Sequence, residues 1–441
     1  MLKRLKELGR YPSAVIGSII LIVFVLFSVH TVLTFPYQEA IRLWKGGPGV
    51  WDDLPRRAKP VWYDWFTKDK LARTIKVPLE DAHMTVVPLG DGRNRVEVVF
   101  PFEFTYDTFP KEISLFTETA EKVTIAAYMR RPHGDTITLT EGKDLRANDI
   151  YRISQDQDLR YRLNETLPHI GLFGERMGRN PGKPVKGQYE VVMVGEMDAT
   201  NELRSAELVV YGQVHGWAGT DHLRRDLTVA LRWGAPIGLM FGVLAAVGST
   251  ITTFILAGIG AWFGGKVDAI FHRLTEVNMI LPLLVVLIMV GHFFSRSIWV
   301  ILGAVILLSI FGSGMKTYRA MFLQAKEAPY IEAAQAYGAG NFRIIFRYLL
   351  PRLVPVLLPS FVTIIPSFVF LEATLAVLGL GDPVLPTWGK IIHSAQANEA
   401  LYMGDYYWVL IPSVILILIG FSFALVGFTL DRIFNPRLRR L

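Results

Sequence analysis

The sequence predicts an α-helical integral membrane protein with six transmembrane helices and a large β-rich domain between the first two. Three observations support this fold class. Apolar residues make up 51% of the 441 residues and charged residues only 19%, a balance typical of membrane proteins. Several largely uncharged stretches are long enough to cross the roughly 30 Å hydrocarbon core of a bilayer. Residues 36–227 instead contain stretches with the two-residue alternation of β-strands.

Six stretches are candidate transmembrane helices: 12–35, 233–263, 277–295, 297–315, 353–381 and 406–430. Only Arg296 separates the third from the fourth, and Glu372 interrupts the fifth. A cleaved signal peptide is the alternative for the first stretch, which follows a basic start. Its uncharged run is longer than the roughly 7–15 residues of a signal-peptide apolar region. We therefore expect a retained helix within a first segment, residues 1–35.

Basic residues beside these stretches predict the orientation. With six spans, four basic clusters fall on one side of the membrane: Lys3, Arg4, Lys6 and Arg10; Lys266 and Arg273; Lys316, Arg319, Lys326, Arg343, Arg347 and Arg352; and Arg432, Arg437, Arg439 and Arg440. The positive-inside rule makes that side cytoplasmic. Both termini are then cytoplasmic, and residues 36–227 form a large extracytoplasmic domain.

The inserted domain is predicted to be a β-sandwich. In VEVVFPFEFTY, alternate residues from Val96 to Tyr106 are apolar, and the intervening set contains Glu97 and Glu103. KVTIAAYM, GQYEVVMVGEM and AELVVYGQV are further strand candidates, separated by turn-forming residues. Residues 36–227 carry 27 basic and 29 acidic side chains, so the net charge of +7 resides beside the apolar spans. This distribution argues against nucleic-acid binding.

Residues 330–355, YIEAAQAYGAGNFRIIFRYLLPRLVP, predict two short helices around a glycine turn on the cytoplasmic side. Gly338 and Gly340 end the first helix, and Asn341 is a suitable N-cap for the second. In the second helix, helical spacing predicts one apolar face made of Phe342, Ile345, Phe346 and Leu349. Periodicity alone favours an amphipathic hairpin that lies at the headgroups.

The spacing within this segment points to a more specific role. Glu332-Ala333-Ala334 is followed after three residues by Gly338 and, after nine more, by Tyr348, Leu350 and Pro351. This order resembles the EAA loop of ATP-binding-cassette (ABC) importer permeases, although Tyr348 stands where that family usually has isoleucine. GTDHLRRDL, GAWFGGKVD, LEATLAVLGLG and PTWGKII resemble, in the right order, stretches of the C-type subunit of dipeptide/oligopeptide (nickel) permeases. In the first of these, Arg224 replaces a glycine.

The resemblance covers about residues 215–436 and the first span, and it implies a function. The chain is expected to be a permease subunit of an ATP-driven importer in a prokaryotic inner membrane, moving di- or oligopeptides, with oligosaccharide or nickel as alternatives. Residues 228–441 form the permease core, and its EAA loop, about 316–352, docks on an ATPase. Implied partners are a second homologous permease, two ABC ATPases, an extracytoplasmic substrate-binding protein and membrane lipid. ATP and magnesium are used by the ATPases, and this chain has no catalytic role.

Five further residues are expected to line the translocation path or the permease interface: Glu372, Gly379, Gly381, Trp388 and Gly389. An ionisable residue within a span usually faces a cavity or a partner, and Glu372 interrupts the fifth span. The alternative for Glu372 is a structural hydrogen bond at the interface with a second permease. The glycines and Trp388 are expected to shape an outer return segment, where Trp is also an ordinary interfacial anchor.

Other sites and functions find less support in the sequence. The chain has no cysteine, which excludes thiolate metal sites and a cysteine nucleophile. GAWFGGKV nearly matches a phosphate-binding P-loop, but Val267 occupies the magnesium-binding position and the stretch follows a predicted membrane helix. We expect this chain to bind no cofactor and no metal. A membrane-anchored sensor or assembly factor, and an ion-coupled carrier, remain as alternatives, although a carrier would need more intramembrane charges than Glu372.

Overall fold

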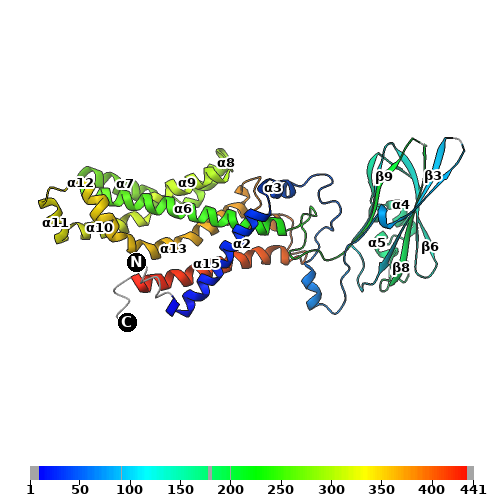
Figure 1. Cartoon of the computed structure of the whole chain (residues 1–441), viewed down its shortest axis with the longest axis horizontal. Helices are drawn as coiled ribbons and strands as arrows, with labels where there is room; N and C mark the ends of the chain where they lie inside the picture. Colours follow the sequence, from blue (N-terminus) through cyan, green and yellow to red (C-terminus); the bar gives the residue numbers. More distant parts are fainter. Residues whose placement is uncertain (1–8, 91, 177–180, 199, 435–441) are drawn as a thin grey trace. The chain divides into compact units, whose positions relative to one another are not determined.

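The computed structural model describes residues 9–90, 92–176, 181–198 and 200–434, which fold as two compact units. One unit combines the segment that ends at Lys45 with Val229–Leu441, and the other is Gly46–Thr228. We call them the membrane unit and the inserted unit (Figure 1). The basic residues expected near the two ends, Lys3, Arg4, Lys6, Arg437, Arg439 and Arg440, lie outside the described residues.

Four helices of the membrane unit are long and apolar enough to cross a bilayer. They are α2 (Pro12–Thr34), α6 (Thr228–Phe263), α15 (Tyr407–Phe434) and a 40-residue run, Asn341–Leu380, whose main part is α13 (Leu350–Leu375). These helices correspond to the first, second, sixth and fifth predicted spans. A short helix, α3 (Tyr37–Lys45), follows α2, and its Tyr37 ring lies 5.3 Å from the ring of Trp233 in α6. In the structure the inserted unit begins at Gly46.

The third and fourth predicted spans are parts of bent helix pairs. Helices α7 (Gly265–Ile280) and α8 (Leu283–Phe293) are bent by 81°, and α9 (Ile298–Ile310) and α10 (Ser313–Lys326) by 44°. Helices α8 and α9 have 11 and 13 residues. At 1.5 Å per residue each is roughly 16–20 Å long, too short to cross alone. The described helices thus give four candidate spans, or up to six if each bent pair counts as one.

A proline and a glycine mark the two bends. Leu281 has the extended backbone (φ −72°, ψ 126°) that a following proline favours, and Pro282 cannot donate a helical hydrogen bond to α7. In the second pair, Gly312 is extended (φ −82°, ψ −168°) and precedes the first residue of α10. Each interruption is therefore explained by local backbone chemistry.

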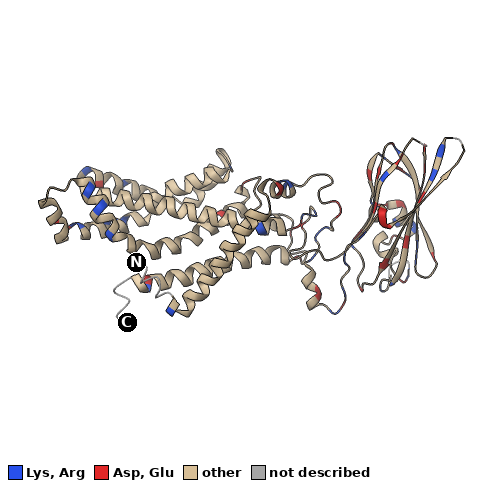
Figure 2. Cartoon of the chain, viewed as in Figure 1, with Lys and Arg blue, Asp and Glu red and all other residues tan. Residues whose placement is uncertain are grey.

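The other helical segments of the membrane unit are α11 (Pro329–Ala336), α12 (Asn341–Arg343), the π-helical turns η5 (Ile344–Leu349) and η6 (Ala376–Leu380), and α14 (Trp388–Ala397). Of these, α12, η5 and η6 are parts of the Asn341–Leu380 run, and α11 and α14 are short separate helices. The prediction that Asn341 caps the second helix of the cytoplasmic segment is wrong. Gly340 occupies the cap position, and Asn341 is already the first helical residue. Figure 2 shows Lys and Arg gathered around α7, α10 and α12, at one end of this unit.

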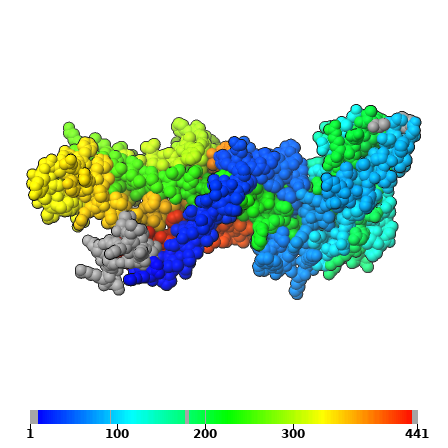
Figure 3. Space-filling model, in the orientation of Figure 1, coloured from blue at the N-terminus to red at the C-terminus, as the bar shows by residue number. Residues whose placement is uncertain are grey.

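Helix α6 packs against α13 and α14 through Gly234, Gly238 and Gly242, which are spaced four residues apart. A Cβ atom on Gly234 would collide with the Trp388 ring, and one on Gly242 would lie 2.5 Å from Val369 and 3.0 Å from the Ile365 carbonyl oxygen. Small residues at this spacing let helix backbones approach closely in membranes. Figure 3 shows the surface of this unit, with α2 in blue crossing the visible face.

The inserted unit contains two antiparallel sheets with a shared core, as a β-sandwich requires. One sheet has the order β1-β9-β4-β7 and the other β2-β3-β8-β5-β6. The strands are β1 (Ile75–Pro78), β2 (His83–Pro88), β3 (Arg93–Phe104), β4 (Glu112–Thr119), β5 (Val123–Arg130), β6 (Thr136–Leu145), β7 (Asn148–Tyr151), β8 (Gly187–Asp198) and β9 (Leu203–Tyr211). The predicted alternation is confirmed for Val96 to Phe104, whose alternate side chains are buried, while Tyr106 lies beyond the end of β3.

Short helical turns complete the inserted unit: η2 (Val61–Phe66), η3 (Leu79–Asp81), η4 (Ile153–Gln155), α4 (Gln157–Arg162) and α5 (Pro168–Gly171). Residues 46–74 and 212–228 run alongside each other before the sheets begin. Backbone hydrogen bonds join Lys59 to Gln213 (2.8 Å) and Val61 to Gly216 (2.9 Å). We call these two paired segments the stem.

We expect Gly242→Ala to destabilise the chain and Gly303→Ala, its matched control, to leave it unchanged or more stable. Both changes raise helix propensity by about 1 kcal/mol. A Cβ on Gly242 overlaps α13, whereas a Cβ on Gly303 meets nothing within 4 Å. Overpacking typically costs about 1–3 kcal/mol. Thermal unfolding in detergent measures the difference, and equal midpoints for the two variants would show that the α6–α13 contact is not tight.

Candidate functional site

The segment that carries the EAA pattern is a compact helical hairpin with a glycine-dependent turn. Gly338 has φ +77°, in the left-handed region that favours glycine. Its N–H donates to the Gln335 carbonyl (2.8 Å), and the Ala339 N–H donates to the Ala334 carbonyl (3.0 Å). These two bonds define a Schellman motif, which satisfies the last carbonyls of α11 and reverses the chain.

One face of the hairpin is built into the core of the membrane unit. Ile331 and Ala334 of α11 are buried, and so are Ile344, Ile345 and Leu349 of the π turn. Ile331 and the three π-turn residues share a cluster with Phe322 of α10 and Trp262 of α6. The hairpin therefore cannot move without moving the helices that carry it.

The predicted apolar face of the second helix is only half right. Ile345 and Leu349 are buried, but Phe342 and Phe346 are exposed and Ile344 takes their place in the core. The cause is the π turn, whose i to i+5 hydrogen bonds widen the helix and bring residues five apart onto one face. Sequence periodicity assumes 3.6 residues per turn and misses this shift.

The other face of the hairpin is exposed. Glu332 and Ala333 are exposed, and Tyr337 is 94% exposed. Beyond the turn, the exposed rings of Phe342 and Phe346 stack at 6.5 Å with an interplanar angle of 14°. Tyr348 is also exposed, Leu350 is partly buried and Pro351 is exposed at the start of α13. Exposed aromatic and alanine side chains on a rigid hairpin are typical of a protein-docking surface.

Polar contacts fix α10, which leads into the hairpin. The Arg319 guanidinium binds the Asp268 carboxylate of α7 through two hydrogen bonds, one of them 2.6 Å long. The Lys326 ammonium donates to the Trp262 carbonyl oxygen (3.0 Å) at the end of α6. Such a two-point guanidinium contact restricts orientation as well as distance. Two helices therefore hold the base of the hairpin.

The five residues expected at the translocation path or permease interface lie in one cluster where α13 meets α14. Glu372 is 8% exposed, and the Thr387 hydroxyl lies beside its carboxyl group. The Trp388 indole donates to the Leu231 carbonyl of α6 (3.0 Å) and is buried, so it is a packing residue rather than an exposed anchor within this chain. A Cβ on Gly389 would lie 2.6 Å from the Ala373 carbonyl oxygen.

The same cluster fixes the return segment after α13. Gly379 has φ +84° and ends the helix, and Gly381 packs against Ala376 and Lys390. The Lys390 ammonium donates to the Asp382 carbonyl (2.7 Å), and the Asp382 carboxylate accepts from the Ile298 N–H (3.0 Å) at the start of α9. The structure thus brings the five predicted residues together inside the chain. A role in the path or at a permease interface stays a prediction.

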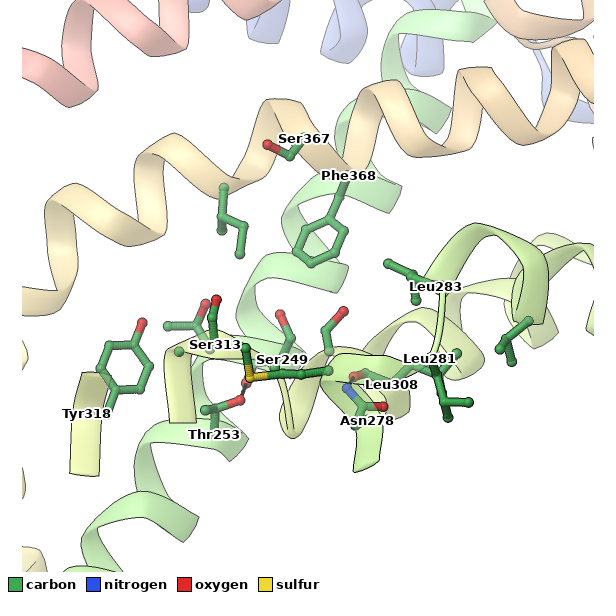
Figure 4. A pocket seen from close by; sticks show the side chains of 17 residues that line it. Ser249, Thr253, Asn278, Leu281, Leu283, Leu308, Ser313, Tyr318, Ser367 and Phe368 are labelled. Carbon is green, nitrogen blue, oxygen red and sulfur yellow. Dashed lines mark hydrogen bonds between the residues drawn. The ribbon is translucent and has the colours of Figure 1, made fainter. Parts of the chain in front are cut away.

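A cavity of about 380 Å³ lies where both helix pairs bend, and no sequence pattern above predicts it (Figure 4). Its polar lining is made of uncharged side chains: Ser249, Thr250, Thr253, Asn278, Ser309, Ser313, Tyr318 and Ser367. The Asn278 amide donates to the Leu308 carbonyl (2.8 Å), and the Thr253 hydroxyl donates to the Ile310 carbonyl (2.9 Å). The sequence feature that could have predicted this cavity is the recurrence of hydroxyl and amide side chains within the apolar spans. No three His, Asp or Glu side chains in the described ranges are grouped as a metal site.

The motif GTDHLRRDL forms the turn that leads into α6. Thr220 and Asp221 are fully buried, and the Leu227 N–H donates to the Gly219 carbonyl (3.1 Å). Burial alone would raise the pKa of Asp226, but the hydrogen bonds from Thr228 and the nearby His215 imidazole, 3.7 Å away, outweigh burial and lower it. Asp226 is therefore ionised, and it organises the first turn of α6 through its bonds to Thr228.

Arg224, the departure from the family pattern, keeps the backbone conformation of a glycine. Its φ is +66°, in the left-handed region. The side chain is buried, lies 4.5 Å from the Tyr211 ring centroid, and donates to the Leu54 carbonyl and the Glu112 carboxylate. These contacts offset the backbone strain and tie the turn to strands β4 and β9 of the sandwich.

The chain is similar to known proteins, both through a family model and through individual relatives. The family model described as "Binding-protein-dependent transport system inner membrane component" matches residues 238–440. The dipeptide transport permease DppC of Bacillus subtilis is 31% identical over 228 residues, which are 51% of this chain and 69% of that protein. The oligopeptide permease OppC of the same organism is 31% identical over 229 residues, 51% of this chain and 72% of that protein.

A third relative is the peptidoglycan transport permease YejE of Agrobacterium fabrum, 31% identical over 190 residues, 43% of this chain and 50% of that protein. The family match lies outside the sandwich, in the part that contains the hairpin, the cavity and the α13–α14 cluster. The chain therefore belongs to the family of inner membrane components of binding-protein-dependent transport systems, the permeases of ABC importers.

Proposed function

We propose that the chain is a permease subunit of an ABC peptide importer and that the hairpin around Gly338 couples it to an ATPase. The observation that carries this proposal is the division of the hairpin into two faces. One face is embedded in the core with α6 and α10, and the other presents Glu332, Tyr337 and Phe342 to solvent. An element that transmits motion needs a stiff attachment to its own helices and a free surface for its partner.

The chemistry of the free face suits an ATPase groove. Alanine and glycine side chains allow close approach of the hairpin backbone, and the stacked Phe342 and Phe346 rings offer apolar area. Glu332 can form a charge-assisted hydrogen bond with a basic partner residue. ATP and magnesium belong to the ATPases in this proposal, and this chain catalyses no reaction.

The proposed assembly contains this chain, a second homologous permease, two ABC ATPases and an extracytoplasmic binding protein. The chain crosses the membrane six times, with each bent helix pair as one span. Both termini and the hairpin are cytoplasmic, and the inserted unit is extracytoplasmic. The basic cluster around α10 and α12 supports this orientation (Figure 2).

Peptides are the proposed cargo. Two relatives are named for dipeptides and oligopeptides. The cavity at the helix bends has hydroxyl and amide groups and no charged side chain in its lining, so it can hydrogen-bond peptide groups without selecting one charge. We propose that it forms this subunit's part of the translocation path.

Gly338→Val should uncouple transport from ATP hydrolysis while the chain still inserts into the membrane. A left-handed backbone costs an L-residue about 1–2 kcal/mol, and a β-branched residue adopts it least readily. A Cβ at Gly338 meets nothing within 4 Å, so the effect is on the turn rather than on packing. We expect weaker retention of the ATPases on purified permease and loss of transport-coupled hydrolysis.

The matched control is Gly340→Val, which adds the same side chain two residues away. Gly340 has φ −68° and ψ 157°, which valine adopts readily, and a Cβ there also meets nothing within 4 Å. Gly338→Asn, a residue that tolerates the left-handed region, should restore part of the coupling. Equal loss in both valine variants would indicate that added bulk, not turn geometry, matters. Normal coupling in Gly338→Val would refute the docking role.

Limited trypsin digestion of sealed vesicles tests the orientation. Arg343 and Arg347 are exposed beside the hairpin turn, so trypsin should reach them in inside-out vesicles and not in right-side-out vesicles. Cleavage within residues 46–228 should show the opposite dependence. Detergent-opened vesicles control for accessibility, and cleavage at Arg347 in intact right-side-out vesicles would invert the proposed topology.

Removal of the sandwich should impair transport without releasing the ATPases. Replacing residues 75–211 by a short linker removes both sheets and keeps the stem, because Gly212 lies directly against Ala72 and Arg73. Arg224 loses Glu112 in this variant, so Arg224→Gly is added to remove an unpaired cation. We expect weaker binding-protein affinity and slower uptake. Unchanged affinity and uptake would exclude a role for the sandwich in delivering cargo, and the full-length Arg224→Gly chain is the control.

A further inference from the structure

We infer that the stem of the inserted unit carries a membrane-surface anchor made of Trp65, Phe66 and Trp217, with lipid headgroups and upper acyl chains as its partner. The inference requires only that the chain is embedded in a membrane. It does not depend on the importer's cargo or on ATPase coupling. It concerns a face of the stem that neither sheet covers.

Three large aromatic side chains of the stem are left exposed. Trp65, Phe66 and Trp217 are 75%, 78% and 74% exposed. Exposed Trp and Phe side chains at such values are costly in water and mark a surface that another phase or partner covers. The helical turn η2 that carries Trp65 and Phe66 has no buried residue, so it contributes little to the core of its own unit.

Trp62 links the two segments that carry these side chains. Its indole Nε1–H donates to the Trp217 carbonyl (2.9 Å), and its ring contacts the Phe66 ring edge-on at 6.3 Å. The Val61 N–H donates to the Gly216 carbonyl (2.9 Å) beside it. The aromatic group is therefore a fixed patch rather than the tip of a loose loop.

Chain connectivity keeps this patch close to the point where α6 enters the membrane. Trp217 is two residues from Gly219, whose carbonyl accepts the Leu227 N–H, and Leu227 precedes the first residue of α6. At about 3.8 Å per residue and about 5 Å across a hydrogen-bonded pair, the patch lies within roughly 15–20 Å of that residue.

The side chains that contact the first turns of α6 indicate where this helix crosses the bilayer surface. The Arg232 guanidinium donates to the hydroxyl of Thr34 (3.1 Å), the last residue of α2, and lies 4.9 Å from the Phe35 ring centroid. Tyr37 and Trp233 stack edge-on at the same level. An arginine with Phe, Tyr and Trp at the end of an apolar helix is typical of the interface. Thr228 is one helical turn, about 6 Å, beyond Arg232.

The composition around the patch favours lipid over water or a rigid protein groove. Residues 59–73 carry four basic side chains, Lys59, Lys68, Lys70 and Arg73, and two acidic ones, Asp64 and Asp69. Aromatic rings with a basic surplus are the combination that binds anionic headgroups. Insertion of the aromatic side chains among the headgroups explains why they are exposed to solvent in the chain alone. It also explains why they are held in place and why basic residues surround them.

Site-specific labelling of the full chain tests the inference, since the protein contains no cysteine. Phe66→Cys and the control Tyr161→Cys are labelled with an environment-sensitive fluorophore in phosphatidylethanolamine/phosphatidylglycerol nanodiscs that contain headgroup-nitroxide lipid. Tyr161 is 79% exposed on α4, beside the sheets (Figure 1). We expect at least about twofold stronger quenching at residue 66 than at 161, as an interfacial residue requires. Adding Trp65→Ser to the Phe66→Cys chain should reduce that quenching.

Three results would overturn the inference. Equal quenching at residues 66 and 161 would show general proximity to lipid rather than an anchor. No lipid quenching at residue 66 would place the patch in water or against protein. Protection of residue 66 by added substrate-binding protein, without lipid quenching, would assign the patch to protein docking. Transport activity enters none of these readouts, so failure here leaves the proposed importer function untouched.

Discussion

Close approach of helix backbones is the interaction on which the membrane unit depends. Gly234 and Gly242 lie two helical turns apart on α6. Trp388 of α14 covers Gly234 and Val369 of α13 covers Gly242, and neither leaves room for a methyl group. In lipid there is little hydrophobic gain from bringing apolar helices together, so contact area and fit must hold them. The same contact positions Trp388 and Gly389, and it thereby orders the α13–α14 cluster around Glu372.

Unpaired backbone groups are the second constraint, and they explain where the cavity lies. Each helix bend leaves carbonyl groups without helical partners, and such groups are costly away from water. Asn278 and Thr253 satisfy carbonyls at the end of α9, so two polar side chains that line the cavity also stabilise the α9–α10 bend. A path for a polar cargo needs hydroxyl and amide side chains. The unpaired carbonyl groups at a helix bend need the same side chains in the same place.

The sequence predicted what depends on local patterns and missed what depends on pairing. Alternation from Val96 to Phe104 foretold β3, and the spacing from Glu332 to Pro351 foretold the hairpin, because both patterns are written in neighbouring residues. The bend at Leu281 was missed although Pro282 was visible, since a proline within an apolar run is also compatible with a kinked span. The burial of Ile344 in place of Phe342 follows from a π turn, which no 3.6-residue periodicity contains. The clustering of Glu372 with Thr387 needed the return of the chain through Gly379 and Gly381.

Arg224 shows how a residue other than glycine can be held in a left-handed turn. A glycine supplies a left-handed turn at no strain, whereas an arginine supplies it only if its side chain gains more than the backbone loses. Here the guanidinium binds Glu112 of β4, the Leu54 carbonyl and the Tyr211 ring, and Leu54, Glu112 and Tyr211 all precede the turn within the inserted unit. The strain is thus maintained by the sandwich. Without these contacts nothing would offset the left-handed strain, and glycine would be the better residue at this position.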